Sequence, residues 1–226
     1  MNIKQYCPKV IVFFGPDGAG KSTQVRLLIG YLKSHKLRTH VAWMRGRHSL
    51  AFILAKFFTK LGYYRAVKSP SGAVHRVFDP QLIPKLRRLW GFIEFASVLP
   101  WIIQRVYLPR ALGYTVVAER YVVDTVVYLG YWLGRDFLRG FLAKVLLVFI
   151  PRGSMLIHMD AETKVLLERR PNDIVTQDYI VFQRGVYRMF AEILEAVTIS
   201  TSTRSVEQNF QHIIKHLNVQ YVGADC

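Results

Sequence analysis

The stretch from Gly15 to Thr23 reads Gly-Pro-Asp-Gly-Ala-Gly-Lys-Ser-Thr and fits the pattern G-x-x-x-x-G-K-[ST]. The run before it, Val10 to Phe14, is entirely apolar and predicts a strand that is buried on both faces. After it, apolar residues recur at helical spacing from Ser22 to Lys36. A strand, this loop and a helix in that order form the context in which the pattern binds nucleotide phosphates.

The residue types of this loop predict distinct roles. The glycines let backbone N–H groups turn toward phosphate oxygens, and the N-terminus of the following helix adds positive potential. We expect Lys21 to reach the β- and γ-phosphates and Ser22 to coordinate Mg²⁺, so the predicted cofactors are ATP and Mg²⁺. The alternative is that the segment is a glycine-rich turn between strand and helix that binds no ligand. The predicted nucleotide-binding residues are Gly15, Asp17, Gly18, Ala19, Gly20, Lys21, Ser22 and Thr23.

The composition predicts one domain over residues 1–226. The chain is 51% hydrophobic, which is enough for a sizeable core, and no linker, repeat or low-complexity tract divides it. Its two cysteines, Cys7 and Cys226, lie at the two ends and form no disulfide framework or zinc pattern. The first strand begins too early to leave room for a signal peptide, so we expect a cytoplasmic protein.

The net charge of +16, from 31 Lys and Arg against 15 Asp and Glu, favours polyanionic partners. Nucleotides, nucleic acid and an anionic membrane surface all meet this description. The basic residues fall in scattered patches, so nucleic acid is not expected, while contact with a membrane surface stays open. The longest apolar stretch, Leu89 to Ile103, contains Glu94 and Pro100 and is shorter than the ~18 residues of a membrane span, so it predicts a buried helix that is kinked or restarted at Pro100.

Strands and helices alternate along the chain, which predicts an α/β fold. We expect three layers: a central parallel sheet of about five strands covered by helices on both faces, of the P-loop NTPase type. Asp160 is predicted to be the N-cap of a helix with Glu162 in its first turn, and Ser205 the N-cap of the last helix. The predicted strands cover residues 10–14, 39–43, 114–118, 154–159 and 197–201, and the predicted helices cover 22–36, 80–112, 124–148, a segment from 161, 177–196 and 205–217.

Glu119-Arg120-Tyr121 follows the third predicted strand, at the edge of the sheet where the glycine-rich loop also lies. Ligands of such sheets bind beyond the carboxyl ends of the strands. A carboxylate there can hold Mg²⁺ or its water shell, and an arginine can bind a phosphate through two hydrogen bonds. The alternative is a surface ion pair at the end of a strand.

These motifs together resemble the thymidylate kinase family of nucleoside monophosphate kinases over nearly the whole chain. The family's P-loop aspartate is matched by Asp17, its Asp/Glu-Arg-Tyr/His motif by Glu119-Arg120-Tyr121, and a later tyrosine by Tyr128. Its Pro-Ala-Leu-x-x-Gly-x-x-Val run resembles residues 109–117, and its Arg-x-x-Tyr motif matches Arg184 to Tyr187. Phe95 falls where the family stacks a phenylalanine on the thymine ring, and Arg169 and Arg170 fall where it has the arginines of a LID segment.

The resemblance implies transfer of the γ-phosphoryl group of ATP to a nucleoside monophosphate, with dTMP converted to dTDP, by a homodimer with a LID near residues 169–177. The implied catalytic residues are Lys21, Glu119, Arg120, Arg169 and Arg170. The implied metal-binding residues are Ser22 and Glu119. The implied acceptor-binding residues are Asp17, Arg45, Phe95, Arg120 and Tyr128.

Three departures from the family bear on the acceptor. Leu99 stands where the family usually has an arginine that grips the acceptor phosphate, and the loop after the second strand keeps only Arg45 of the usual motif. Asp124 is unusual and either caps the helix that begins there or contacts the acceptor. Another nucleotide, a sugar phosphate or a lipid-linked phosphate therefore remains an alternative acceptor. A third reading is an NTPase that binds nucleic acid or a membrane and uses hydrolysis as a switch.

Overall fold

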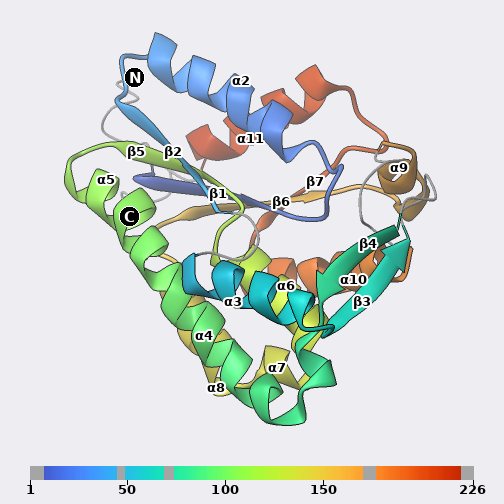
Figure 1. Cartoon of the computed structure of the whole chain (residues 1–226). Helices are drawn as coiled ribbons and strands as arrows, with labels where there is room; N and C mark the ends of the chain where they lie inside the picture. Colours follow the sequence, from blue (N-terminus) through green and yellow to red (C-terminus); the bar gives the residue numbers. More distant parts are fainter. Residues whose placement is uncertain (1–7, 45–48, 69–73, 170–176, 220–226) are drawn as a thin grey trace.

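The computed structural model describes residues 8–44, 49–68, 74–169 and 177–219. A parallel sheet of five strands runs through the middle of the molecule in the order β2-β5-β1-β6-β7 (Figure 1). The strands are β1 (Val10–Phe14), β2 (Thr39–Trp43), β5 (Thr115–Glu119), β6 (Met155–Asp160) and β7 (Val197–Ser200).

Strand β1 lies at the centre of the sheet and shows why the fold is layered. All of its residues are buried, because helices cover both faces of the sheet. Val10, Val12 and Phe14 point into one hydrophobic cluster, while Ile11 and Phe13 point into another. A continuous apolar run is what a strand needs when neither of its faces meets water.

The two clusters define the outer layers. Helices α2 (Lys21–Ser34) and α11 (Val206–Val219) cover one face of the sheet (Figure 1). The other face carries most of the remaining helices. The chain is therefore a three-layer α/β fold with a five-stranded parallel sheet, as predicted. The helices of the second face are α3 (Ser49–Lys60), α4 (Pro84–Ile102), α6 (Val122–Leu133), α8 (Phe141–Val148) and α10 (Gln177–Ile193), and two shorter helices are α7 (Asp136–Arg139) and α9 (Thr163–Glu168).

The single helix predicted over residues 80–112 is wrong in detail. The chain forms a 3₁₀ turn over Pro80–Leu82, then α4, then a π-helical segment over Ile103–Tyr107, and then α5 (Leu108–Ala111). Pro100 lies inside α4 without ending it. Pro109 has no N–H to continue the regular hydrogen-bond ladder, and the π segment directly precedes its turn. Gly113 follows the last turn with a φ of 81°, the left-handed conformation in which glycine commonly ends a helix.

Three elements were not predicted at all. They are α3 and the two strands of an antiparallel hairpin, β3 (Tyr64–Lys68) and β4 (Val74–Phe78). The hairpin is tied to the following turn by an ion pair between Arg65 and the buried Asp79, whose atoms are 2.7 Å apart.

The predicted cap at Asp160 is wrong, whereas Asp124 does cap its helix, from the third helical position and not as the N-cap residue. Helix α9 begins at Thr163 with Glu162 as its N-cap, so Asp160 remains the last residue of β6. Helix α6 begins at Val122, two residues before Asp124, and the carboxylate of Asp124 accepts the N–H of the N-cap residue Tyr121. Asp160 instead binds Arg184 and Arg188, which are distant in the sequence and which the local pattern does not contain. The cap at Ser205 is confirmed, since its hydroxyl accepts the N–H of Gln208 at 3.2 Å.

Among the described residues, no helix has the length and apolar character needed to cross a membrane.

Candidate functional site

Residues 15–20, here called the glycine-rich loop, join the end of β1 to the start of α2. Its three glycines, Gly15, Gly18 and Gly20, have φ values of 139°, 86° and 82°. Residues other than glycine rarely adopt such φ values, because their Cβ atom clashes with the backbone. At Gly15 a Cβ atom would lie 2.1 Å from the carbonyl oxygen of Met159, so the loop packs directly against strand β6. The sequence of the loop is therefore dictated by its backbone path.

Lys21 is the first residue of α2 and is almost fully buried. Its ammonium group donates to the carbonyl oxygens of Gly15 and Pro16, at 2.6 and 2.7 Å. The lysine thus curls over the glycine-rich loop and places its charge where the loop's N–H groups and the helix N-terminus also act.

Ser22 and Glu119 meet across the site from segments far apart in the sequence. The Ser22 hydroxyl donates to Glu119 Oε1 at 2.5 Å. Glu119 ends β5, which pairs with β1, and this pairing brings its carboxylate to the first turn of α2. A hydroxyl and a carboxylate together are oxygen ligands of the kind that Mg²⁺ prefers. The donor set therefore fits a magnesium ion beside the glycine-rich loop.

Arg120 forms an ion pair with Asp17, and both side chains are buried. Its backbone is unusual, with a φ of 62° in a residue other than glycine, and its N–H donates to Phe13 at 3.1 Å. Non-glycine residues in this region cost of order 1–3 kcal/mol and persist only where the surroundings fix them. The β5 end and the glycine-rich loop are thus locked together by one charged pair.

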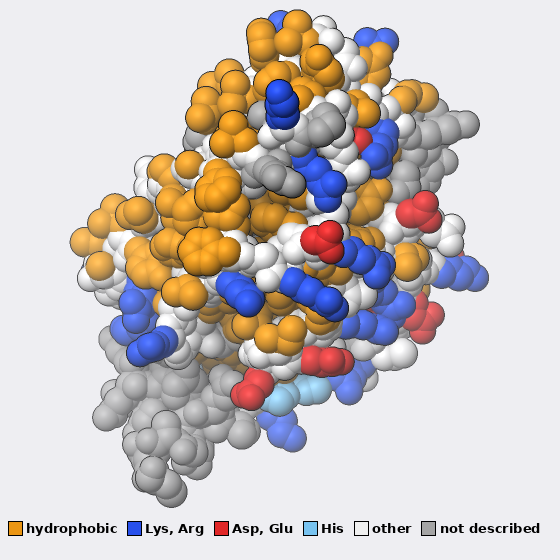
Figure 2. Space-filling model, turned by 90° about the horizontal axis from the view of Figure 1, so that it is seen from below, with side chains coloured by type: hydrophobic (Ala, Val, Ile, Leu, Met, Phe, Trp, Pro, Cys, Tyr) orange, Lys and Arg blue, Asp and Glu red, His pale blue; other side chains and the backbone are white. Residues whose placement is uncertain are grey.

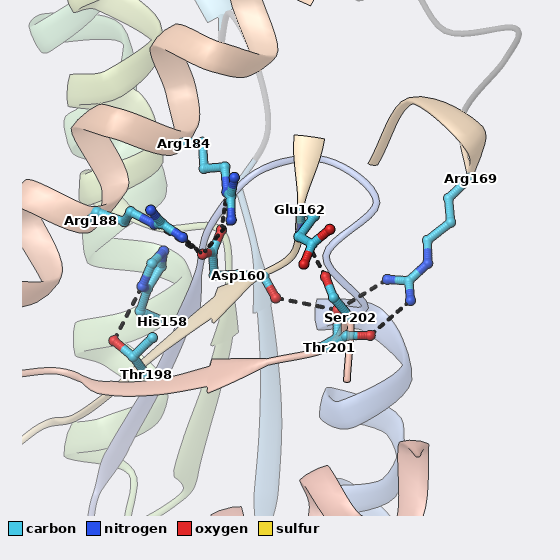
Figure 3. A network of polar contacts seen from close by, with 9 residues as sticks. All are labelled: His158, Asp160, Glu162, Arg169, Arg184, Arg188, Thr198, Thr201 and Ser202. Carbon is cyan, nitrogen blue, oxygen red and sulfur yellow. Dashed lines mark hydrogen bonds and ion pairs between the residues drawn. The ribbon is translucent and has the colours of Figure 1, made fainter. Parts of the chain in front are cut away.

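Arg169, the residue after α9, reaches back to the glycine-rich loop. Its guanidinium donates to the carbonyl oxygen of Gly18 at 3.0 Å. It also donates to the hydroxyl and the carbonyl oxygen of Thr201, each at 3.0 Å (Figure 3). This arginine therefore bridges the loop after β1 and the end of β7.

These residues surround a pocket of about 480 Å³ at the carboxyl edge of the sheet. Its size is typical of a site for a small molecule. Among the described residues that line it, Glu119 is the one acid and four are bases. The four bases favour a bound anion, and the single carboxylate favours a cation bound next to that anion. The lining residues are Gly18, Gly20, Lys21, Ser22, Thr23, Gln24, Glu119, Arg120, Arg169, Thr201, Arg204, Val206 and Asn209.

A second charged cluster holds the end of β6 next to this pocket. Asp160 accepts Arg184 Nε at 2.9 Å and Arg188 Nη2 at 2.7 Å, both from helix α10 (Figure 3). Burial alone would raise the pKa of Asp160, but its hydrogen bonds to the two arginines outweigh this and hold the pKa below the usual value. The backbone carbonyl of Asp160 also accepts the N–H of Thr201. Helix α10 is thereby fixed to the strand that supports the glycine-rich loop.

His158 lies two residues earlier on β6 and is fully buried. Its Nδ1 is 3.3 Å from the Thr198 hydroxyl, and its ring stacks on Phe14 with centroids 5.4 Å apart. Burial lowers its pKa from 6.5 to about 4, and the attraction of Asp160 opposes this only in part. The imidazole is therefore neutral at pH 7.

This neutral histidine makes a pH-dependent contribution to stability. In the unfolded chain the histidine takes up a proton below about pH 6.5, whereas in the folded chain it does so only near pH 4. The free energy of unfolding therefore falls as the pH is lowered through this interval. We expect a loss of about 3 kcal/mol between pH 6.5 and 4. Urea titrations at a series of pH values should show it in the wild type and not in His158→Phe, which keeps the stacking. Equal slopes for the two proteins would contradict the assignment.

Asp124 is buried beside the site and pairs with helix α10. Tyr187 donates its hydroxyl to Asp124 Oδ1 at 2.8 Å. Burial raises the pKa of Asp124, against the attraction of Arg120 and Lys21. Burial raises the pKa of Tyr187 as well, and the nearby Asp124 adds to this. This pair joins α6 to α10 behind the cations of the pocket.

The structure brings together only part of the predicted site. Phe95 and Tyr128 are half-buried against the hydrophobic cluster beneath the sheet and do not line the described pocket. Arg45, Arg170 and the LID segment from 170 to 176 lie outside the described residues.

Several lining residues were missed by sequence reasoning. Thr201, Arg204, Val206 and Asn209 come from the connection after β7 and the start of α11, and Gln24 from α2. The only available signal was the rule that ligands gather beyond strand ends, which points to the end of the predicted strand 197–201.

The side chains of the site have the charges and donor groups that suit a polyanion and a divalent cation. Four bases, a helix N-terminus and a hydroxyl–carboxylate pair converge within one pocket. No model of a known protein family matches the sequence.

Proposed function

We propose that the protein is a P-loop kinase that transfers the γ-phosphoryl group of ATP to a nucleoside monophosphate, with dTMP as the first acceptor to test. One observation carries the proposal: Lys21, the Ser22–Glu119 pair and Arg120 converge around a glycine-rich loop at the carboxyl edge of a parallel sheet. The resemblance of the motifs to the thymidylate kinase family supports the choice of acceptor.

In this proposal Lys21 exchanges the carbonyl oxygens of Gly15 and Pro16 for the β- and γ-phosphate oxygens. Ser22 and Glu119 would hold Mg²⁺, which would supply positive charge beside the phosphates. Arg169 faces the same pocket and adds a further positive charge. No general base is required, because the attacking oxygen of a monophosphate is already ionised. The P–O bond to ADP breaks as the bond to the acceptor oxygen forms.

Among the described residues, the part of the site that would bind the acceptor phosphate has few charged side chains free of other contacts. Leu99 packs against the hydrophobic cluster and has no charge to offer a phosphate. Arg120 is paired with Asp17, so an acceptor phosphate would have to share its guanidinium with this carboxylate. This observation favours a second candidate, a kinase of the same fold whose acceptor is another nucleotide, a sugar phosphate or a lipid-linked phosphate.

A panel assay tests the proposal. The protein is incubated with ATP and Mg²⁺ alone, and then with each of the nucleoside monophosphates, sugar phosphates and a lipid-linked phosphate, while ADP and the phosphorylated product are measured. A kinase releases ADP at an appreciable rate only with its acceptor. Rapid hydrolysis of ATP without acceptor, or on addition of a polyanion alone, would instead support a nucleotide switch and refute the kinase.

Replacing Glu119 with glutamine is expected to raise the Mg²⁺ concentration needed for half-maximal activity by about ten-fold. The substitution keeps an oxygen near Ser22 but removes the charge that favours the metal. Mg²⁺ titrations at saturating ATP measure the effect, with Glu162→Gln as control because Glu162 is exposed and lies outside the pocket. An unchanged titration would reduce Glu119 to a hydrogen-bond partner of Ser22.

A further inference from the structure

Helices α3, α4 and α8 leave large apolar side chains uncovered on one side of the molecule. The helices are neighbours, since α4 packs against both α3 and α8. On α8, Phe141 and Val148 are 75% and 78% exposed. Isolated exposed residues of this kind are ordinary, but contiguous ones mark a surface for interaction. We call this surface the apolar face, and its exposed members are Leu50, Phe52, Ile53, Phe57, Leu89, Phe92, Phe141 and Val148.

Lysines are interleaved with these apolar residues on the same helix faces. On α3, the exposed residues Ile53, Lys56, Phe57 and Lys60 lie three or four residues apart and so share one face of the helix. The Lys56 ammonium lies 4.4 Å from the ring of Phe52. Helix α8 repeats the pattern, with exposed Lys144 between Phe141 and Val148. Such lysines can lay their stems on apolar surface and extend their charges beyond it.

Acidic side chains are missing from this part of the surface. Between residues 18 and 118 the sequence contains only two acids, Asp79 and Glu94, and both are buried. Helix α8 contains none, and Asp136 just before it is flanked by Arg135 and Arg139. Figure 2 shows the same division: hydrophobic side chains gather toward the left and top with basic ones among them, and most acidic ones lie to the right and below.

This combination of charge and hydrophobicity selects the partner. Two copies of the chain meeting through the apolar face would bring Lys56, Lys60 and Lys144 near their own equivalents with no acid on that face to neutralise them. Nucleic acid would satisfy the lysines but not the aliphatic side chains of Leu50, Ile53 and Leu89. An anionic bilayer offers both phosphate groups for the lysines and an acyl boundary for the apolar residues.

We propose that the apolar face binds the surface of an anionic phospholipid membrane, with α3 and α8 lying at the headgroup boundary. Their apolar side chains enter the acyl region, and Lys56, Lys60 and Lys144 contact lipid phosphates. Two weak signals, hydrophobic insertion and charge attraction, combine to give reversible binding. The proposal does not depend on which reaction the pocket supports.

Co-sedimentation of the full chain with vesicles tests this. We expect binding to vesicles of equimolar phosphatidylcholine and phosphatidylserine, little binding to phosphatidylcholine alone, and release as salt is raised. Ile53→Ser with Phe57→Ser should weaken binding to the anionic vesicles about ten-fold. Lys56→Gln with Lys60→Gln should weaken it by a similar factor, about ten-fold.

Matched controls come from the same chain. Ile193 on α10 is 64% exposed, as Ile53 is, but lies outside the apolar face, so Ile193→Ser should bind as the wild type does. Lys33→Gln with Lys36→Gln removes the same charge from the end of α2 and should also have little effect. Thermal melts establish that each variant is folded.

Three outcomes would overturn the proposal. The wild type could bind the two kinds of vesicle equally weakly. The control variants could lose binding as much as those of the apolar face, which would mean that net charge alone is responsible. Sedimentation could show a dimer that Ile53→Ser converts to a monomer without any vesicle binding, which would assign the apolar face to a second copy of the chain.

Discussion

Replacing Lys21 with methionine is expected to lower kcat for phosphoryl transfer by about 10³-fold, the loss typical of removing a preorganised group that stabilises the charge of the transition state. Methionine keeps the apolar stem and removes the ammonium that lies over the glycine-rich loop. The ammonium donates to the carbonyl oxygens of Gly15 and Pro16. Losing hydrogen bonds from this charged donor should lower the free energy of unfolding by about 1–3 kcal/mol, a loss that a domain of ordinary stability survives.

The measurement is a steady-state assay with the acceptor identified by the panel, together with a urea unfolding curve. Lys33→Met is the control, because Lys33 lies in the last turn of the same helix and is exposed. A Lys21 variant that stays folded and keeps activity within a few-fold of the wild type would remove the lysine from the chemistry. A variant that unfolds would show instead that its buried hydrogen bonds are structural.

Replacing Gly15 with alanine is expected to destabilise the fold by about 3 kcal/mol or more, regardless of function. A residue with a side chain pays a backbone penalty at a φ of 139°, of order 1–3 kcal/mol. The new methyl group would also lie 2.1 Å from the carbonyl oxygen of Met159, so β1 or β6 must move. Forcing atoms into a packed site costs roughly another 1–3 kcal/mol.

The chain contains a matched control for this substitution. Gly30 lies within α2 with open space around its Cβ position, so Gly30→Ala should stabilise the protein by about 0.5–1 kcal/mol. Urea denaturation of the two variants beside the wild type measures both changes, which have opposite signs. If Gly15→Ala were as stable as the wild type, the close approach of the glycine-rich loop to β6 would be wrong.

The sequence by itself determined most of the strands of the sheet and the glycine-rich loop that joins β1 to α2. Val10 to Phe14 predicted β1 with its observed bounds, and the spacing after the loop predicted α2 to within two residues at each end. Glu119 was correctly placed at the end of a strand. These features depend on residues within one helical turn or one strand pleat of each other. Such local patterns can be recognised in the sequence without knowledge of the tertiary structure.

Helix α3 was missed because its sequence pattern is not that of a helix with one buried face. The apolar residues of α3 lie on its exposed side as well as its buried side, so its pattern does not mark one buried face. The burial that distinguishes the two sides comes from α4, which packs against α3. The uncovered side is the one for which we propose a membrane as partner.

Only the tertiary structure decided which charged groups meet. Asp160 had every local mark of a helix cap, yet Arg184 and Arg188 hold it on β6, because two guanidinium groups bind a buried carboxylate more strongly than a backbone N–H does. Arg120 met Asp17 across 103 positions of sequence, and Arg169 met Gly18 across 151. Contacts of this kind depend on how strands are ordered in the sheet, and a pattern of neighbouring residues carries no record of that order.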